Sequence, residues 1–236
     1  MRYAHVVFDN VARTRGLKTG WGFAAVVFGY DRRILFDTGA SPDKLLSNML
    51  ALRVSPSEVD AVVISHVHDD HMGGLMGFLR ANHRIEVFLP EGVKPEVIEQ
   101  VEGTGAAPII VSEGGEIAPG VATTGVLGGR RAEQALVFDG DEAATLLTGC
   151  AHPGLDVLVE AGREQFGVPV RLVIGGFHLK RHSKKAVGAL AEKLQRLGVE
   201  FIAPSHCTGE RSSLVLAEAF GEGYVPSGLG TRIPLV

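Results

Sequence analysis

The chain has 236 residues, of which 45% are hydrophobic and 21% are charged, and its formal net charge at pH 7 is −4. A net negative charge argues against a general nucleic-acid-binding protein, and no apolar run approaches the length of a membrane-spanning helix. The N-terminal stretch is too short and too polar for a signal peptide. The two cysteines, Cys150 and Cys207, form no C-x-x-C pair, so we expect a cytoplasmic protein with reduced thiols.

The first half of the chain predicts a strand at 2–8, followed by a β-hairpin that joins 21–30 to 33–36. Ser41-Pro42 is typical of a helix start, because serine caps the first turn and proline suits the first helical position, so we expect a helix through Leu52. The further elements expected in this half are a turn from Ser55-Pro56, strand 61–65, helix 72–82, strand 85–89, helix 95–102 and weak strands at 108–112 and 121–127.

The second half alternates strands and helices in the same way. The elements expected there are strands 135–138 and 144–148, helix 154–166, strand 170–174, helix 183–197, strand 199–203 and helix 210–220. Such an order suits two sheets packed face to face with helices outside. We predict one α/β domain over residues 1–236, in which both halves share one core.

Three imidazoles and two carboxylates lie within six residues directly after the strand expected at 61–65. In an extended segment His66 and His68 point to the same side, because residues two apart share a face, so two nitrogens can hold one metal ion. Asp70 and His71 follow after the chain turns and can face a second ion, and the glycine pair behind them allows a tight bend. Histidine and carboxylate ligands suit Zn, Mn or Fe. The alternative is a solvated His/Asp loop.

Three later strand ends carry further candidate residues. Cys150 and His152 follow strand 144–148, His206 follows strand 199–203, and His178 follows strand 170–174. A lone histidine such as His178 is more often a hydrogen-bonded neighbour of a metal site than a metal ligand. As an acid or base it would titrate near neutral pH, which suits protonation of a leaving group.

The chain resembles the metallo-β-lactamase superfamily over nearly its whole length. More narrowly it resembles the branch that contains 7,8-dihydropterin-6-methyl-4-(β-D-ribofuranosyl)-aminobenzene 5′-phosphate synthase. The stretches that carry the resemblance are Trp21-Gly22-Phe23, Asp37-Thr38-Gly39, His66-x-His68-x-Asp70-His71, Gly149-Cys150-x-His152, Gly175-Gly176-Phe177-His178-Leu179 and His206-Cys207-Thr208-Gly209.

The resemblance implies a four-layer αββα sandwich and a site for one or two divalent metal ions (Zn, Mn, Mg or Fe). It implies that Asp37 supports the metal-binding loop by hydrogen bonding behind the ligands. The ligands it implies are His66, His68, Asp70, His71, His152 and His206. Cys150 stands where most of the superfamily has a bridging aspartate. Either Cys150 bridges as a thiolate, or His152 serves and the second site is weaker.

A basic run lies just after His178, into the start of the helix expected at 183–197. Cations at a helix start are unfavourable, because the helix dipole favours negative charge there. An anion bound among them would explain their position, so Lys180, Arg181 and Lys184 are candidate phosphate-binding residues. A solvated helix face is the alternative interpretation.

The function implied is a metal-dependent enzyme that acts on a phosphorylated or pyrophosphorylated small molecule. It would be either a transferase that releases diphosphate or a hydrolase that uses a metal-bound hydroxide. His178, as the proton carrier, and Asp70 are the candidate catalytic residues. We expect neither a nucleic-acid nor a membrane partner. The alternative is a non-catalytic or regulatory metal-binding protein that retains the fold.

Overall fold

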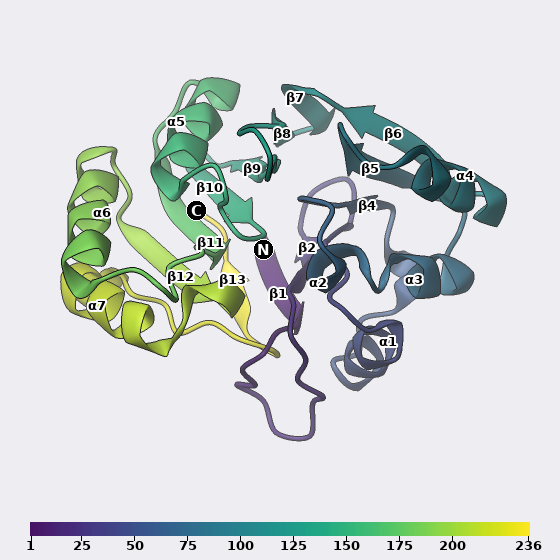
Figure 1. Ribbon diagram of the computed structural model, residues 1–236, viewed down its shortest axis with the longest axis horizontal. Coiled ribbons are helices and arrows are strands. Elements are labelled where there is room, and N and C mark those ends of the chain that lie inside the picture. Colours follow the sequence, from purple (N-terminus) through teal and green to yellow (C-terminus); the bar gives the residue numbers. More distant parts are fainter. The chain divides into compact units, whose positions relative to one another are not determined.

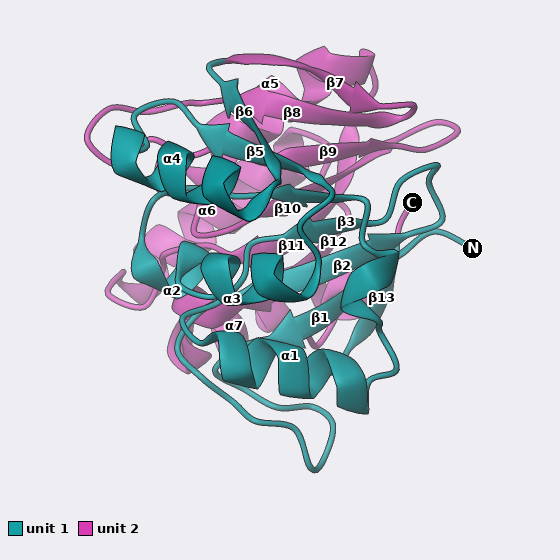
Figure 2. Ribbon diagram, turned by 90° about the vertical axis from the view of Figure 1, so that its right-hand side faces the viewer, with its two compact units in different colours: residues 1–112, 228–234 teal, residues 113–227, 235–236 magenta.

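The strands of the computed structural model, which describes all 236 residues, form two mixed sheets of seven and six strands. The chain divides into two units, each containing one of these sheets (Figure 2). Unit 1 consists of residues 1–112 and 228–234, and unit 2 of residues 113–227 and 235–236. Each unit also has its own hydrophobic cluster. The single domain over 1–236 stays a prediction.

Unit 1 holds the seven-stranded sheet, in the order β13-β1-β2-β3-β4-β5-β6 (Figure 1). Neighbours from β13 to β3 are antiparallel and those from β3 to β6 are parallel. The strands are β1 (Tyr3–Phe8), β2 (Ala24–Phe28), β3 (Ile34–Phe36), β4 (Ala61–Val63), β5 (Glu86–Pro90), β6 (Ala107–Val111) and β13 (Arg232–Pro234). The helices are α1 (Pro42–Ala51), the 3-10 turn η1 (Pro56–Glu58), α2 (Asp69–Met72), α3 (Leu75–Ala81) and α4 (Pro95–Thr104).

Alternate residues of the unit 1 strands pack against its helices. Val62 and Val87 of neighbouring strands lie in one cluster with Leu45 of α1 and Phe78 of α3. Each such side chain contributes about 2 kcal/mol through removal of apolar surface from water. Helix α1 begins as predicted, with proline at its first position and the Ser41 hydroxyl accepting a hydrogen bond from a backbone N–H of the first turn.

Unit 2 holds the six-stranded sheet, in the order β12-β11-β10-β9-β8-β7. Strands β10, β11 and β12 are parallel neighbours, and those from β10 to β7 are antiparallel. The strands are β7 (Glu113–Ala118), β8 (Val121–Gly125), β9 (Leu136–Asp139), β10 (Ala144–Thr148), β11 (Val170–Gly176) and β12 (Phe201–Ser205). The helices are α5 (Leu155–Phe166), α6 (Lys184–Arg196), α7 (Glu210–Phe220) and the 3-10 turns η2 (His206–Thr208) and η3 (Gly221–Gly223). No helix of the structure combines the length and the apolar character needed to cross a membrane.

Two predictions about the segment after His66 are wrong. The helix expected at 72–82 starts earlier and is two helices, α2 and α3, separated by Gly73 and Gly74. These glycines have ordinary helical φ angles of −63° and −80°. The tight bend that the glycine pair was expected to allow is therefore absent. They are needed for space, because a Cβ at Gly74 would lie 2.2 Å from the carbonyl oxygen of Thr38.

Strand β1 buries a histidine whose titration should make stability depend on pH. His5 is 2% exposed, and burial, followed by the charge of Arg232, lowers its pKa from 6.5 to about 4. As the pH falls from 6.5 to about 4, the unfolded chain takes up a proton on His5 and the folded chain does not. Stability is therefore lost over this window, by about 3 kcal/mol from this group.

Urea unfolding of wild type and His5→Gln at several pH values between 7.5 and 4 would measure this loss. The free energy of unfolding should fall more steeply with decreasing pH in the wild type than in the variant. Equal slopes would show that His5 titrates normally in the folded protein.

Candidate metal centre

The candidate residues of unit 1 come from two neighbouring parallel strands. Phe36, the last residue of β3, pairs with Val63, the last residue of β4. Residues directly after these strands therefore leave the sheet at the same edge. Asp37 follows β3, and Ser65 and His66 follow β4, which brings residues 28 positions apart in the sequence into hydrogen-bonding distance.

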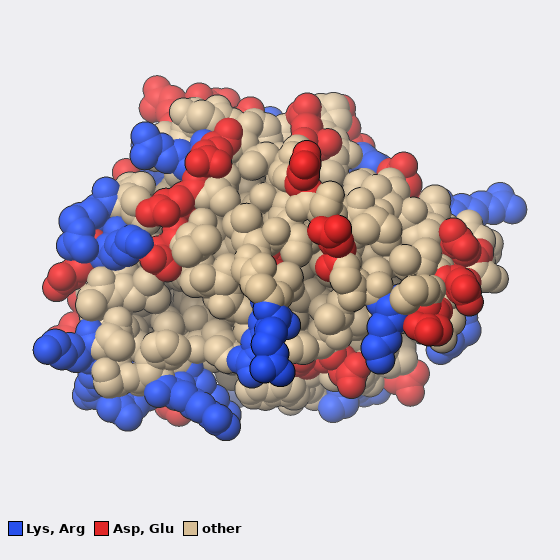
Figure 3. All heavy atoms as spheres, turned by 45° about the horizontal axis from the view of Figure 1, so that its top comes forward, with Lys and Arg blue, Asp and Glu red and all other residues tan.

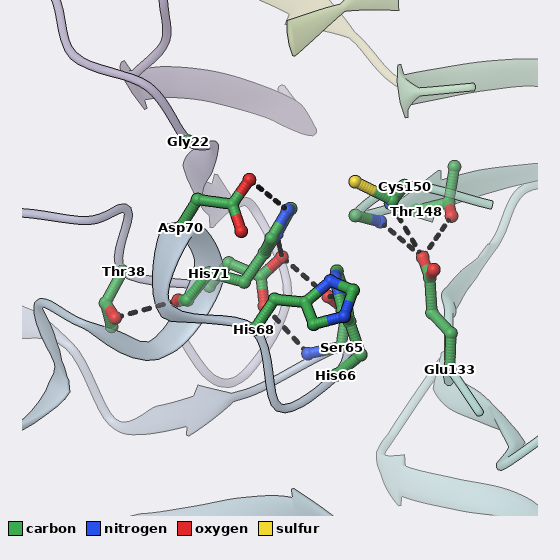
Figure 4. A network of polar contacts seen from close by, with 12 residues as sticks. Gly22, Thr38, Ser65, His66, His68, Asp70, His71, Glu133, Thr148 and Cys150 are labelled. Atoms are coloured by element: carbon green, nitrogen blue, oxygen red, sulfur yellow. Dashed lines mark hydrogen bonds and ion pairs between the residues drawn. The ribbon is translucent and has the colours of Figure 1, made fainter. Parts of the chain in front are cut away.

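Asp37 holds three groups of the following loop. Its Oδ1 accepts from the Ser65 backbone N–H at 2.7 Å, and its Oδ2 accepts from the Ser65 hydroxyl and from Nδ1 of His71, each at 2.7 Å. All three residues are fully buried (Figure 4 shows Ser65 and His71). Because the ring of His71 gives its Nδ1 proton to a carboxylate, its Nε2 carries the lone pair and lies 3.8 Å from Oδ2 of Asp70.

The two histidines after β4 face each other through ring nitrogens. Nε2 of His66 lies 3.0 Å from Nδ1 of His68. The single hydroxyl proton of Ser65 goes to Asp37, so Ser65 accepts from Nδ1–H of His66, which lies 2.8 Å away. The lone pair of His66 is therefore on Nε2.

These residues fit a metal ion by the chemistry of their donors. Two nitrogens that are about 2.0–2.1 Å from one tetrahedral ion lie roughly 3.3 Å apart, close to the separation of the His66 and His68 nitrogens. We call His66, His68, Asp70 and His71 the His66 cluster. Its members differ in access, because His66 and His71 are buried, Asp70 is half-buried and His68 is exposed, so the cluster opens to solvent on one side.

The candidate residues of unit 2 come from the ends of three parallel strands. Thr148 of β10 pairs with Gly175 of β11, and Gly176 of β11 pairs with Ser205 of β12. The residues that follow these strands meet at one edge of the sheet for the same reason as in unit 1. We call Cys150, His152, His178, His206 and Cys207 the thiol–imidazole cluster.

Possible ligand atoms within this cluster lie close together in two groups. Those of Cys150, His206 and Cys207 are all within 4.8 Å of one another, and so are those of Cys150, His152 and His178. Three non-glycine residues there have positive φ, namely Ala151 (55°), His178 (52°) and His206 (46°). Such backbone strain persists where the surrounding structure holds the residues in place, and it is concentrated at functional sites.

A buried glutamate, Glu133, organises the loop that carries Cys150 and His152. Its Oε1 accepts from the Thr148 hydroxyl at 2.8 Å and from the backbone N–H groups of residues 149–151 at 2.8–3.0 Å. Its Oε2 accepts from the backbone N–H and from Nδ1 of His152, at 3.1 Å and 3.0 Å. The Nε2 of His152 therefore carries the lone pair, as in His71.

Sequence reasoning missed Glu133. The only local signal is one charged residue shortly before the apolar strand β9, and such residues are common. Figure 4 shows Glu133 with Thr148 and Cys150.

The two thiols are neighbours in the structure. Sγ of Cys207 lies 3.2 Å from Sγ of Cys150, and both cysteines are buried and form no disulfide. The backbone N–H of His178 donates to Sγ of Cys207 at 3.2 Å. Hydrogen bonds from Cys150 and His178 hold the pKa of the Cys207 thiol below its usual range, although burial opposes this. A hydrogen bond between the ring of His178 and Cys207 raises the pKa of His178.

The basic run after β11 lies at the surface. Lys180, Arg181 and Lys184 are exposed. Ser183 caps α6, since its hydroxyl accepts from the backbone N–H of Ala186 at 3.2 Å. Exposed cations of this kind contribute little to binding individually, so phosphate binding at these residues stays a prediction.

Two curated proteins are similar to this chain in sequence. A curated 7,8-dihydropterin-6-methyl-4-(beta-D-ribofuranosyl)-aminobenzene-5'-phosphate synthase from Methanocaldococcus jannaschii is 27% identical over 241 aligned residues, covering 83% of this chain and 82% of that protein. Ribonuclease Z from Nanoarchaeum equitans is 36% identical over 74 residues, which cover 29% of this chain and 22% of that protein.

The fold has a close counterpart among solved structures. The crystal structure of Tm1679, described as a metal-dependent hydrolase of the beta-lactamase superfamily, matches with a TM-score of 0.82 and 27% identity, covering 99% of this chain and 98% of that one. The predicted α/β fold class is thereby confirmed. A family model of the metallo-beta-lactamase superfamily matches residues 22–206, well over half of the chain. The chain therefore belongs to the metallo-beta-lactamase superfamily.

Proposed function

We propose that the protein is a metal-dependent enzyme that acts on a phosphorylated or pyrophosphorylated small molecule. The observation that carries this proposal is the His66 cluster, in which buried hydrogen bonds from Nδ1–H of His66 and His71 to Ser65 and Asp37 direct the Nε2 lone pairs away from the supporting groups. Such support of metal ligands is usual in functional metal sites. The likeness to the 7,8-dihydropterin-6-methyl-4-(beta-D-ribofuranosyl)-aminobenzene-5'-phosphate synthase supports the phosphorylated substrate.

The proposed metal is one or two divalent ions, Zn, Mn, Mg or Fe. A bound ion would polarise a phosphoryl or acyl oxygen and make water more acidic. The residues proposed as metal ligands are His66, His68, Asp70, His71, His152 and His206. Asp37 fixes the orientation of His71, and Glu133 fixes that of His152.

Two reactions suit these residues. In a transfer reaction an aryl carbon or nitrogen of the substrate attacks an activated methylene carbon, and the diphosphate bonded to that carbon leaves. In a hydrolysis water attacks a phosphoryl or acyl centre. We propose His178 as the proton carrier in both, because its ring is exposed and can exchange protons with solvent. Asp70, half-buried beside His71, is the second proposed catalytic residue.

A small-molecule substrate is favoured over nucleic acid by the charge of the chain. The face that Figure 3 shows carries acidic and basic side chains side by side rather than a basic stripe, and the net charge is −4. A binding surface for nucleic acid is usually strongly positive. We also propose a cytoplasmic location, which is supported by two cysteines that form no disulfide.

A substrate panel tests the proposed function. Metal-depleted protein would be assayed against a phosphodiester, a pterin diphosphate, a thioester and a lactone, each with Mn, Zn or Mg added back. We expect metal-dependent turnover of a phosphorylated member. His68→Ala should reduce it roughly a hundredfold or more, since loss of a supporting partner alone costs about 10–100-fold.

His83→Ala is the matched control, because His83 is an exposed histidine outside the cluster, and its activity should equal that of the wild type. Turnover that persists without metal would contradict the proposal. Metal binding without turnover of any substrate would instead favour a regulatory metal-binding protein.

A further inference from the structure

The proposed function gives no reason for the contact between the thiols of Cys150 and Cys207 in unit 2. Cys150 and Cys207 come from the ends of two strands, β10 and β12, that are not adjacent, since β11 lies between them in the sheet. Their sulfur atoms nevertheless lie 3.2 Å apart. A disulfide requires about 2.05 Å, so the two sulfurs are in contact without a bond.

The backbone is shaped to let this contact form. A Cβ at Gly176, on the strand between the two cysteines, would lie 2.8 Å from Sγ of Cys207 and 2.4 Å from the carbonyl oxygen of Gly149. Gly175 has a φ of +125°, and a Cβ there would lie 1.9 Å from the carbonyl oxygen of Thr148. Only glycine fits at these two positions, and the missing side chain of Gly176 leaves room for Sγ of Cys207.

The surroundings of the thiols are polar. Buried cysteines that serve only for packing usually lie among apolar side chains. Here an imidazole nitrogen of His206 lies within 4.8 Å of both sulfurs, and the N–H of His178 points at Sγ of Cys207. Both histidines have positive φ, so strained backbone holds them beside the thiols.

We propose that Cys150, Cys207 and His206 ligate one thiophilic metal ion, with both sulfurs bound to it as thiolates. Two sulfurs that are each about 2.3 Å from a tetrahedral ion lie roughly 3.8 Å apart, so a small opening of the present 3.2 Å pair admits the ion. Three protein ligands leave a fourth position open, as catalytic sites require.

This donor set narrows the choice of metal. Thiolate with imidazole selects Zn²⁺, Fe²⁺ or Co²⁺ and disfavours Mg²⁺ and Mn²⁺, which prefer oxygen ligands. The inference rests on the proposed function only in one respect: His206 is a metal ligand in both proposals. It assigns Cys207, which is otherwise without a role, as a ligand, and it makes Cys150 a terminal thiolate.

X-ray absorption of the zinc-loaded His66→Ala/His68→Ala protein tests the ligands with both cysteines intact and without zinc bound by those two histidines. We expect two sulfur scatterers per ion at about 2.3 Å. One sulfur per ion would overturn the role of Cys207, and none would overturn the site.

Cobalt substitution gives an independent test under reducing conditions. The cobalt-loaded wild type should show a near-ultraviolet absorption band from thiolate-to-cobalt charge transfer. Cys207→Ser and Cys150→Ser should each show about half of this absorption, and the double variant should show none. His68→Ala should retain the band, because its residue lies outside this donor set. A wild-type cobalt complex without the band, or a folded Cys207→Ser with the full band, would refute the proposal. A wild-type protein that shows the charge-transfer band but turns over no substrate would contradict the proposed enzymatic function and leave the thiolate site intact.

Discussion

Glu133→Ala is expected to lower the free energy of unfolding by about 4 kcal/mol. The side chain is fully buried and accepts from six donors, namely the Thr148 hydroxyl, the backbone N–H groups of residues 149–152 and Nδ1 of His152. Each buried donor that loses its acceptor costs about 1–3 kcal/mol. The sum is reduced because water enters the space left behind and satisfies some of them.

Glu133→Gln separates charge from shape. It keeps one acceptor oxygen but turns an amide N–H₂ toward donors, so an intermediate loss of about 2 kcal/mol is expected. Glu142→Ala, an exposed glutamate in the turn before β10, is the matched control and should change stability by less than about 0.5 kcal/mol. Urea unfolding of all three variants makes the comparison. A Glu133→Ala protein as stable as the control would mean that this network does not hold the loop.

Asp37→Asn is expected to reduce metal affinity by about 10–100-fold. Asn can adopt the positive φ of 56° seen at Asp37, so the backbone is preserved while the carboxylate charge is lost. The amide oxygen can replace only one of the two carboxylate oxygens. With the oxygen at Oδ1, it still accepts from the Ser65 backbone N–H, and the amide N–H₂ faces the Ser65 hydroxyl and Nδ1 of His71. The ring of His71 then loses the partner that fixes its tautomer and orientation.

Titration of Zn²⁺ into metal-depleted wild type and Asp37→Asn measures the change. Asp31→Asn, an exposed aspartate in the turn between β2 and β3, provides the control and should bind like the wild type. Unchanged affinity in Asp37→Asn would show that the hydrogen bonds of Asp37 serve the fold alone.

Local patterns predicted most of the elements. Helix α1 could be placed from Ser41-Pro42 because capping depends on residues within one turn. Strand β7 was missed because its sequence, Glu113–Ala118, contains two glycines and no apolar alternation, so pairing with β8 decides its conformation. Strand β13 was missed because three residues near the C-terminus form a strand only by pairing with β1.

The residues of the candidate site also divide into those that a local pattern predicts and those that only the tertiary fold brings together. The histidines after β4 lie in one short stretch, so their spacing alone indicated metal binding. Glu133 and Cys207 had no such local signal. Their roles depend on which strands are neighbours and in which register, as with Gly176 opposite Ser205, and these are consequences of tertiary folding.

Metal content is the most direct test of the account. Protein purified without added metal would be analysed by mass spectrometry for wild type, a His66→Ala/His68→Ala double variant and the His83→Ala control. We expect at least one divalent ion per chain in the wild type and the control, and a clear loss in the double variant, because two facing imidazole nitrogens are removed. A wild-type protein that is folded but neither contains nor takes up a divalent ion would contradict the proposal that this chain is a metal-dependent enzyme.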